Sequence, residues 1–237
     1  NHSINYAYDE RGLRTTTTDQ RGKVTRYEHI PAGQANSGLL AAVISPEGRR
    51  TEAEYDATGR RVASTDPRGT APGADRRTFT TEYRFDAQDR VVEVSEPGKR
   101  HSWRTDYDEV GRVSSTVNPE HVKVEYRYLA NGRLEKVTDP RKTTSISYTN
   151  AGRRAAVRIE MGRGEQDFVT AYRYNAKGLL HQTISPRGNV SGANPADFTT
   201  TYLYDANDNL VRISRPYPGG QVVHKDIKVD ELDRTTS

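Results

Sequence analysis

The sequence predicts an all-β protein, a repetitive series of antiparallel β-hairpins that forms one continuous curved sheet strip. Three observations predict this fold. A short motif recurs at restrained spacing, aromatic residues recur two positions apart before it, and turn sequences containing Pro, Gly, Asp and Asn separate the alternating stretches. No segment of ten or more residues combines helical periodicity with caps, so we expect helix content near zero.

The recurring motif begins with an aromatic residue, followed by Asp or Asn, two variable residues, Gly or a substitute for it, and usually Arg or Leu. Eight clear copies begin at residues 8, 55, 85, 107, 128, 148, 174 and 204, and degenerate copies begin near residues 29 and 229. A period of 20 to 50 residues is typical of repeat architectures. Ten units without a break in composition predict a single domain over residues 1–237.

Each unit starts with a strand that enters a turn. Aromatic pairs such as Tyr83 and Phe85, or Tyr202 and Tyr204, are two residues apart, which places both rings on one face of a strand.

The motif itself predicts the turn. Asp or Asn can cap a turn through its side chain, and the fifth motif residue suits a positive φ, which Gly adopts freely and Asp or Asn tolerates best. Where Gly is absent, the substitute is Asp89, Asp208 or Asp233. We therefore expect a type I turn followed by a bulge. The turn residues predicted to have this structural role are Asp9, Gly12, Asp56, Gly59, Asp86, Asp89, Asp108, Gly111, Gly132, Gly152, Gly178, Asp205 and Asp208.

A second alternating stretch follows each motif, as in residues 91–94 and 209–213, and ends in a second turn signal such as Asp66-Pro67-Arg68-Gly69. Each unit is thus two strands and two turns. Longer loops are expected at residues 68–75, 160–165 and 188–195. Because they occur at one recurrent place in the unit, we expect them to project from one rim.

These repeats, Tyr-Asp-x-x-Gly-Arg with a following Asp-Pro-x-Gly, resemble the YD or Rhs repeats of bacterial Rhs and wall-associated proteins, toxin complex C components and animal teneurins. The resemblance covers residues 6–234. It implies an open section of a YD/Rhs shell in a secreted or cell-surface protein of bacterial origin. The partners implied are further repeats and a C-terminal effector, such as a toxin, on the same polypeptide.

The two ends of the sequence favour a segment of a longer protein. Residues 1–4 do not resemble a signal peptide, and the chain stops inside a repeat unit. Some relatives of this type cleave themselves, but no residue here matches that region.

Composition excludes several classes of function. The net charge of +4 is spread along the chain, which argues against nucleic-acid binding. No apolar run approaches the ~20 residues of a membrane-spanning helix, and the absence of Cys excludes disulfides and thiolate metal sites. Mean hydropathy is −0.92, yet 14 Tyr against 4 Phe indicate apolar mass carried on rings with a polar end, which suits a sheet partly in water.

The sequence predicts no catalytic residue, metal site or cofactor. The six His residues share no metal-ligand spacing, and the acidic stretch 205–209 has Pro216 where a calcium loop needs Glu. A residue that recurs in most repeats is better explained by the turn than by acid–base chemistry. The glycines at 162–164 and 218–220 do not lie between a strand and a helix, as a phosphate loop requires.

Two alternatives concern surface binding. The recurring Arg residues could bind an anionic glycan, or pair with Asp and stack on Tyr; we favour the latter. Trp103 could be a sugar platform, but an inward anchor is favoured. The predicted function is a non-catalytic shell wall. The alternative is a carbohydrate- or cell-surface-binding module that uses the Tyr/Arg face or the rim loops. The recurring Arg residues are Arg60, Arg90, Arg112, Arg133 and Arg153.

Overall fold

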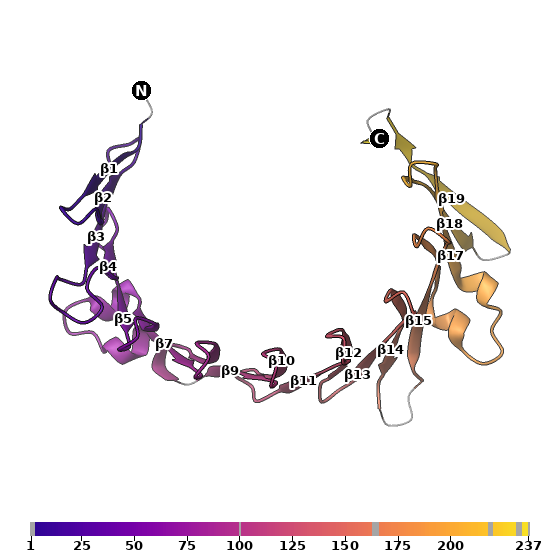
Figure 1. The fold of residues 1–237 in the computed structure, drawn as a ribbon, viewed down its shortest axis with the longest axis horizontal. Coiled ribbons are helices and arrows are strands. Elements are labelled where there is room, and N and C mark those ends of the chain that lie inside the picture. Colours follow the sequence, from indigo (N-terminus) through magenta and orange to yellow (C-terminus); the bar gives the residue numbers. More distant parts are fainter. Residues whose placement is uncertain (1–2, 100, 163–165, 218–219, 231–233, 237) are drawn as a thin grey trace. The chain divides into compact units, whose positions relative to one another are not determined.

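The computed structural model describes residues 3–99, 101–162, 166–217, 220–230 and 234–236. It divides the chain into two compact units, Asn1–Lys123 and Val124–Ser237, each of which is described by itself. Both units consist of antiparallel strands in chain order (Figure 1). The single domain over residues 1–237 stays a prediction.

The first unit is a meander of ten strands, and each strand pairs antiparallel with the next. Its strands are β1 (Asn5–Tyr8), β2 (Arg14–Thr18), β3 (Val24–His29), β4 (Leu40–Ile44), β5 (Arg50–Tyr55), β6 (Arg61–Thr65), β7 (Thr80–Phe85), β8 (Val91–Ser95), β9 (Ser102–Tyr107) and β10 (Val113–Val117).

The second unit repeats this meander from β11 to β19. Its strands are β11 (Lys123–Tyr128), β12 (Leu134–Thr138), β13 (Thr143–Tyr148), β14 (Arg154–Glu160), β15 (Phe168–Tyr174), β16 (Leu180–Ile184), β17 (Thr199–Tyr204), β18 (Leu210–Tyr217) and β19 (Gln221–Asp226). A short pair, β20 (Lys228–Val229) and β21 (Thr235–Thr236), follows. The prediction of an all-β chain built from consecutive antiparallel hairpins is confirmed.

The described helices are short 3-10 segments in the connections between repeats. They are η1 (Pro67–Thr70), η2 (Arg76–Phe79), η3 (Pro97–Lys99), η4 (Pro186–Asn189) and η5 (Pro195–Phe198). Two of the predicted long loops thus hold a pair of 3-10 turns each, η1 with η2 and η4 with η5. Both loops follow the second strand of a hairpin, which is the recurrent place that the sequence predicted. The third long loop begins after β14, and residues 163–165 lie outside the described part.

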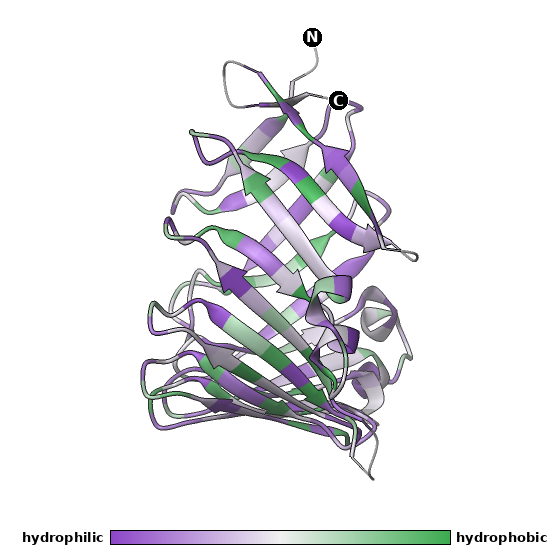
Figure 2. Cartoon of the chain, turned by 90° about the vertical axis from the view of Figure 1, so that its right-hand side faces the viewer, coloured by the Kyte–Doolittle hydropathy of each residue, from purple (hydrophilic) through white to green (hydrophobic). Residues whose placement is uncertain are grey.

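The sheet separates two kinds of side chain. In the second unit Tyr202 is the register partner of Ile213, while their chain neighbours Leu203 and Arg212 pair on the other face. Figure 2 shows this alternation of hydrophobic and hydrophilic residues along the strands. Period-two patterning of this kind is expected of a sheet whose faces meet different surroundings.

Few described residues are fully buried, because the described strands of each unit form a single layer that leaves both sheet faces without a covering layer. Buried apolar side chains are Ala42, Ala63 and Ile184. The hydroxyls of Thr65 and Thr80 lie 2.9 Å apart and are both buried. Ala63, Thr65, Thr80 and Ile184 belong to strands that flank the 3-10 loops, so these loops form small local cores.

Candidate functional site

The repeat turn has a fixed hydrogen-bond pattern, shown by residues 56–60. The Asp56 amide donates to the Arg60 carbonyl at 2.9 Å, and the Gly59 amide donates to the Asp56 carbonyl at 3.1 Å. The Asp56 carboxylate accepts from the amides of Thr58 and Arg60 at 2.9 and 3.0 Å. Together with the register shift at Tyr55, this is a type I turn closed by a bulge. The same carboxylate cap occurs at Asp9, Asp86, Asp108 and Asp205.

The fifth motif residue adopts a left-handed conformation in the eight clear copies of the motif. Asp89 and Asp208, which replace Gly, have φ of 61° and 68°. Asp233 lies outside the described residues. The glycines at this position, with φ from 76° to 86°, are Gly12, Gly59, Gly111, Gly132, Gly152 and Gly178.

The degenerate copy near residue 29 differs from its prediction. Gly33 was expected at the left-handed position, but the equivalent hydrogen bond runs from the Gly38 amide to the Ile30 carbonyl at 3.0 Å. The Ile30 amide in turn donates to the Leu39 carbonyl at 2.9 Å. Five extra residues therefore lie inside this turn. Gly33 also has a positive φ, of 82°, but within the inserted loop. Sequence spacing alone could not tell these two glycines apart.

The capping carboxylates have depressed pKa values. Desolvation raises the pKa of Asp56, but hydrogen bonds from the Thr58 and Arg60 side chains and amides outweigh it and hold that pKa well below the usual range. Backbone hydrogen bonding lowers the pKa of Asp9, mainly from Leu13, and that of Asp205, mainly from Asn209. These groups are ionised turn caps and are poorly suited to hold a proton for general acid catalysis.

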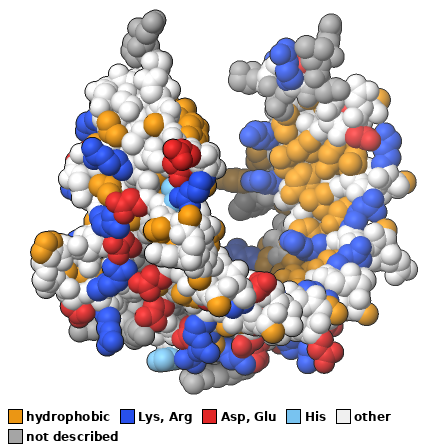
Figure 3. Space-filling model, turned by 60° about the vertical axis from the view of Figure 1, so that its left-hand side comes forward, with side chains coloured by type: hydrophobic (Ala, Val, Ile, Leu, Met, Phe, Trp, Pro, Cys, Tyr) orange, Lys and Arg blue, Asp and Glu red, His pale blue; other side chains and the backbone are white. Residues whose placement is uncertain are grey.

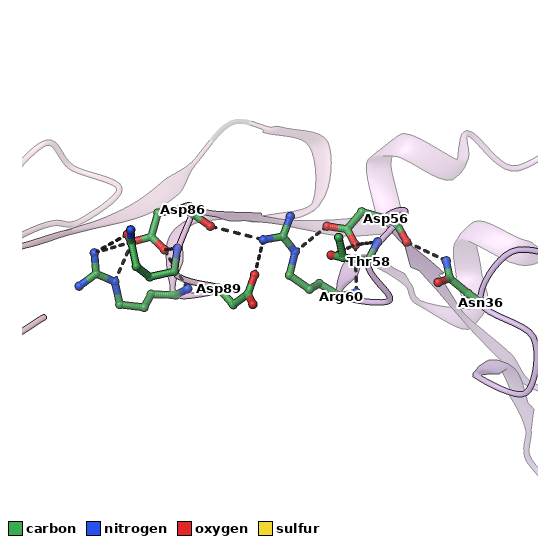
Figure 4. Close-up of polar contacts among 8 residues, drawn as sticks. Asn36, Asp56, Thr58, Arg60, Asp86 and Asp89 are labelled. Carbon is green, nitrogen blue, oxygen red and sulfur yellow. Dashed lines mark hydrogen bonds and ion pairs between the residues drawn. The ribbon is translucent and has the colours of Figure 1, made fainter.

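The recurring Arg residues connect successive repeats (Figure 4). The Arg60 guanidinium donates to Asp56 of its own turn at 2.6 Å and to Asp89 of the next turn at 2.6 Å, and it lies 5.1 Å from the Phe85 ring centroid. Arg60 thus both pairs with Asp and lies over an aromatic ring. Guanidinium-over-ring contacts of the same kind as Arg60 with Phe85 join Arg90 to Tyr107, Arg133 to Tyr148 and Arg153 to Tyr174.

A second contact between repeats is made by the hydroxyl of the Tyr that begins the motif. The sequence did not predict this contact. Tyr148 Oη donates to the Leu134 carbonyl of the preceding repeat at 2.7 Å. The ladder between β12 and β13 ends before that residue, so the hydroxyl satisfies a carbonyl that the sheet leaves unpaired. The excess of Tyr over Phe was the available signal. Equivalent bonds are made by Tyr55, Tyr107, Tyr174 and Tyr204.

The two faces of the sheet differ in chemistry. One face carries aromatic and aliphatic register partners, such as Tyr126 with Val137 and Ile146 with Val157. The other carries charged rows, such as Arg84, Glu93 and Arg104 in the first unit, where both Arg residues pair with the Glu. Figure 3 shows a field of hydrophobic side chains on one face of the C-terminal half, and mixed charges on the N-terminal half.

Trp103 belongs to the aromatic face, opposite Val94, and its indole Nε1 lies 3.4 Å from the Glu96 carboxylate. It is 49% exposed, so its ring is only half covered within this chain.

No metal-binding group of three or more His, Asp or Glu side chains forms among the described residues. Ser214 Oγ and His224 Nδ1 are 2.8 Å apart, which superficially resembles a nucleophile and its base. The nearby Asp226 carboxylate is instead paired with Arg212 at 2.5 Å. Among the described residues no hydrogen bond orients the His224 ring through its other nitrogen, as a catalytic base requires. Within the described part of the chain, no helix combines the length and apolarity needed to cross a bilayer.

The repeat turns, the inter-repeat contacts and the two-faced meander agree with a family-level match. The family model described as teneurin YD-shell matches residues 1–215. The chain belongs to the teneurin YD-shell family. The YD-shell match spans most of the repeats and includes all thirteen predicted turn residues.

Individual relatives agree with this assignment. The toxin protein Tse5 of Pseudomonas aeruginosa is 30% identical over 135 residues, which cover 56% of this chain and 9% of Tse5. The crystal structure of TcdB2-TccC3 gives a TM-score of 0.51 at 14% identity, over 99% of this chain and 16% of that chain. That of TcdB2-TccC3-TEV gives 0.50 at 15% identity, over 98% and 16%. At these identities the structural likeness shows a shared fold alone.

Proposed function

We propose that this chain is non-catalytic wall material of a YD shell, and that the shell encloses or displays another part of the same polypeptide, a C-terminal effector such as a toxin. The observation that carries the proposal is the asymmetry of the sheet. One face presents apolar and aromatic side chains, and the described residues of neither unit form a second layer that covers it. Extended apolar surface of this kind is characteristic of an interaction face.

The inter-repeat contacts support a wall. Neighbouring repeats are joined by Arg-to-aromatic stacks at Arg60, Arg90, Arg133 and Arg153. Tyr hydroxyl bonds join several of them as well, and at Arg60 the ion pair with Asp89 adds a further link. These contacts use the side chains that a glycan-binding ladder would need, so the ladder is best explained as structure. The capping aspartates are likewise used in turns.

The relatives support the cargo and the location. Tse5 is named as a toxin, and this chain spans only 9% of it, so the wall segment is small compared with the proteins that it resembles. We place the chain in a secreted or cell-surface protein of bacterial origin, with further repeats on the same polypeptide as its immediate partners.

Limited proteolysis of the full-length protein that contains these repeats tests the proposal. Peptides should be mapped by mass spectrometry while denaturant is raised in steps. A stretch downstream of the repeats should resist protease until the repeats themselves unfold. Rapid digestion of everything downstream, while the repeats stay intact, would contradict enclosure. The same downstream stretch expressed alone is the control for intrinsic resistance.

A further inference from the structure

The acidic side chains of the strands gather on one face of each unit. Successive side chains of a strand point to opposite faces, so Glu82, which precedes Tyr83 of the aromatic face, points away from that face. The strand carboxylates that share this orientation are Glu28, Glu52, Glu54, Glu82, Glu93, Asp106, Glu125, Glu160 and Asp226. We call the face that carries them the charged face.

One further strand carboxylate, Glu135, has no register partner because it lies at a bulge. It lines a hollow of the charged face together with Arg127 and Lys136. Among the described strands β1 to β19, the aromatic face therefore carries no carboxylate.

Basic side chains, in contrast, occur on both faces. Arg61 lies 5.5 Å from the Tyr83 ring centroid, which places its guanidinium on the aromatic face. Lys225 is the register partner of Ile213, whose other partner is Tyr202. The basic strand residues of the aromatic face are Arg14, Arg61, Arg154, Arg215 and Lys225. Strand residues thus give this face positive charge only.

The cations of the two faces differ in their partners. On the charged face, for example, Arg50 pairs with Glu28 and Glu52, at 2.7 and 2.6 Å. The five cations of the aromatic face are all exposed, and none of them forms an ion pair within the described part of the chain. Water and dissolved ions surround these charges while the face is open.

Covering the aromatic face changes this balance. A cation that a partner shields from water is strongly destabilised unless a carboxylate pairs with it. The strands offer no carboxylate on this face, so a partner that covers it has to supply one. Three of the guanidinium groups, those of Arg14, Arg61 and Arg154, lie over Tyr rings at 4.1, 5.5 and 5.9 Å. These ring contacts restrict the side chains and so reduce the entropy that is lost when a carboxylate binds.

We propose that the aromatic face binds acidic segments of the enclosed effector, in which Asp or Glu residues are interspersed with apolar ones. The inference rests on the proposed enclosure and adds the chemistry of the enclosed segment. Guanidinium groups bind carboxylates through paired, charge-assisted hydrogen bonds, and Tyr rings accept apolar side chains. A basic segment would meet like charges on this face and would find no strand carboxylate to pair with.

Isothermal titration calorimetry on the 237-residue chain tests the charge preference. The probe is a peptide of repeated Gly-Leu-Ser-Glu units, and the two matched controls carry Gln or Lys in place of Glu. We expect the Glu peptide to bind at least about tenfold more tightly than either control, and added salt to reduce the difference. Equal or tighter binding of the Gln or Lys peptide would overturn the acidic assignment. Absence of binding by the Glu peptide would overturn it as well.

Variants then assign the binding to one face. R154Q/R215Q removes two cations from the aromatic face of the second unit and should weaken binding of the Glu peptide about tenfold. R127Q/K136Q is the matched control, because Arg127 and Lys136 are register partners on the charged face and form no ion pair within the described residues. It should leave binding unchanged. R61Q repeats the test in the first unit and should also weaken binding.

Thermal unfolding of each variant shows whether the fold is kept. Unchanged binding by folded R154Q/R215Q and R61Q would overturn the assignment to the aromatic face. An equal loss of binding in R127Q/K136Q would overturn it too.

Limited proteolysis of the full-length protein separates this inference from enclosure itself. We expect a protected downstream stretch together with a preference for the Glu peptide. Protection without that preference would leave enclosure standing and overturn the acidic assignment. A preference for the Glu peptide without protection would overturn enclosure and keep the aromatic face as a binding surface for acidic polypeptide.

Discussion

The Arg60 guanidinium and the Asp89 carboxylate, 29 residues apart in the chain, meet at 2.6 Å between two successive repeat turns. Asp89 occupies the left-handed position that Gly holds in most copies. Where Gly152 and Gly178 hold this position, a guanidinium from the preceding repeat occupies the space of the missing Cβ. Arg133 Nη2 lies 2.0 Å from the place of a Cβ on Gly152, and Arg153 Nη2 lies 1.9 Å from that on Gly178. This position therefore accommodates the Arg of the preceding repeat in two ways. Gly leaves room for the guanidinium above it, and Asp forms an ion pair with the guanidinium.

A double-mutant cycle tests the coupling between these two residues. R60Q and D89N should each destabilise the chain slightly, and together by less than their sum, because each single change already breaks the shared ion pair. Asn keeps the tolerance for positive φ, so D89N leaves the turn intact. Urea unfolding gives the coupling, which should shrink as salt is raised since Asp89 is largely exposed. Strict additivity would show that the ion pair contributes nothing.

The tyrosine hydroxyl bond should be measurable by itself. Y148F removes the donor to the Leu134 carbonyl and should cost about 1 kcal/mol, because a partly buried acceptor loses its partner. Y8F is the matched control, since Tyr8 is 60% exposed and its hydroxyl has no bond within the described residues. Denaturant unfolding should separate the two variants. An equal effect of both would indicate a general preference for Tyr, without a role for the bond.

Gly69 is required for close packing and has no positive φ. G69A should destabilise the chain by roughly 1–3 kcal/mol, because the added methyl would lie 2.8 Å from Phe79 Cβ and from Thr65 Cγ2. T65S removes that methyl and should recover part of the loss. G73A is the contrasting variant, since Gly73 has open space but φ of +77°, so T65S should not rescue it. Thermal unfolding of G69A, G69A/T65S, G73A and G73A/T65S checks this.

Acid should weaken the turns. The pKa of Asp56 in the folded chain is lower than in the unfolded chain, so its contribution is complete above the unfolded value, about pH 4, and is lost as the pH falls toward the folded value. D56N should keep the turn, because Asn175 already caps an equivalent turn through the Leu179 amide at 2.9 Å. Its stability should fall less steeply than that of the native chain below pH 4. Parallel slopes in urea titrations would contradict this.

Local sequence was sufficient to predict the hairpins. The left-handed position at Gly59 and its Asp substitute at Asp89 follow from backbone sterics within five residues, and the Asp56 cap follows from side-chain length. Sequence spacing failed at Gly33, where a five-residue insertion placed Gly38 in the equivalent position. A local pattern cannot show which of two nearby glycines closes the ladder, because that depends on strand pairing.

By itself, the sequence determined the class of fold, the repeat and the chemistry of each turn, because these depend on residues close together in the chain. Only the tertiary structure decided which repeats touch through which atoms: Arg60 with Asp89, and Tyr148 with Leu134. These relationships join residues 29 and 14 positions apart. They depend on the register and packing of neighbouring hairpins, which no single motif encodes.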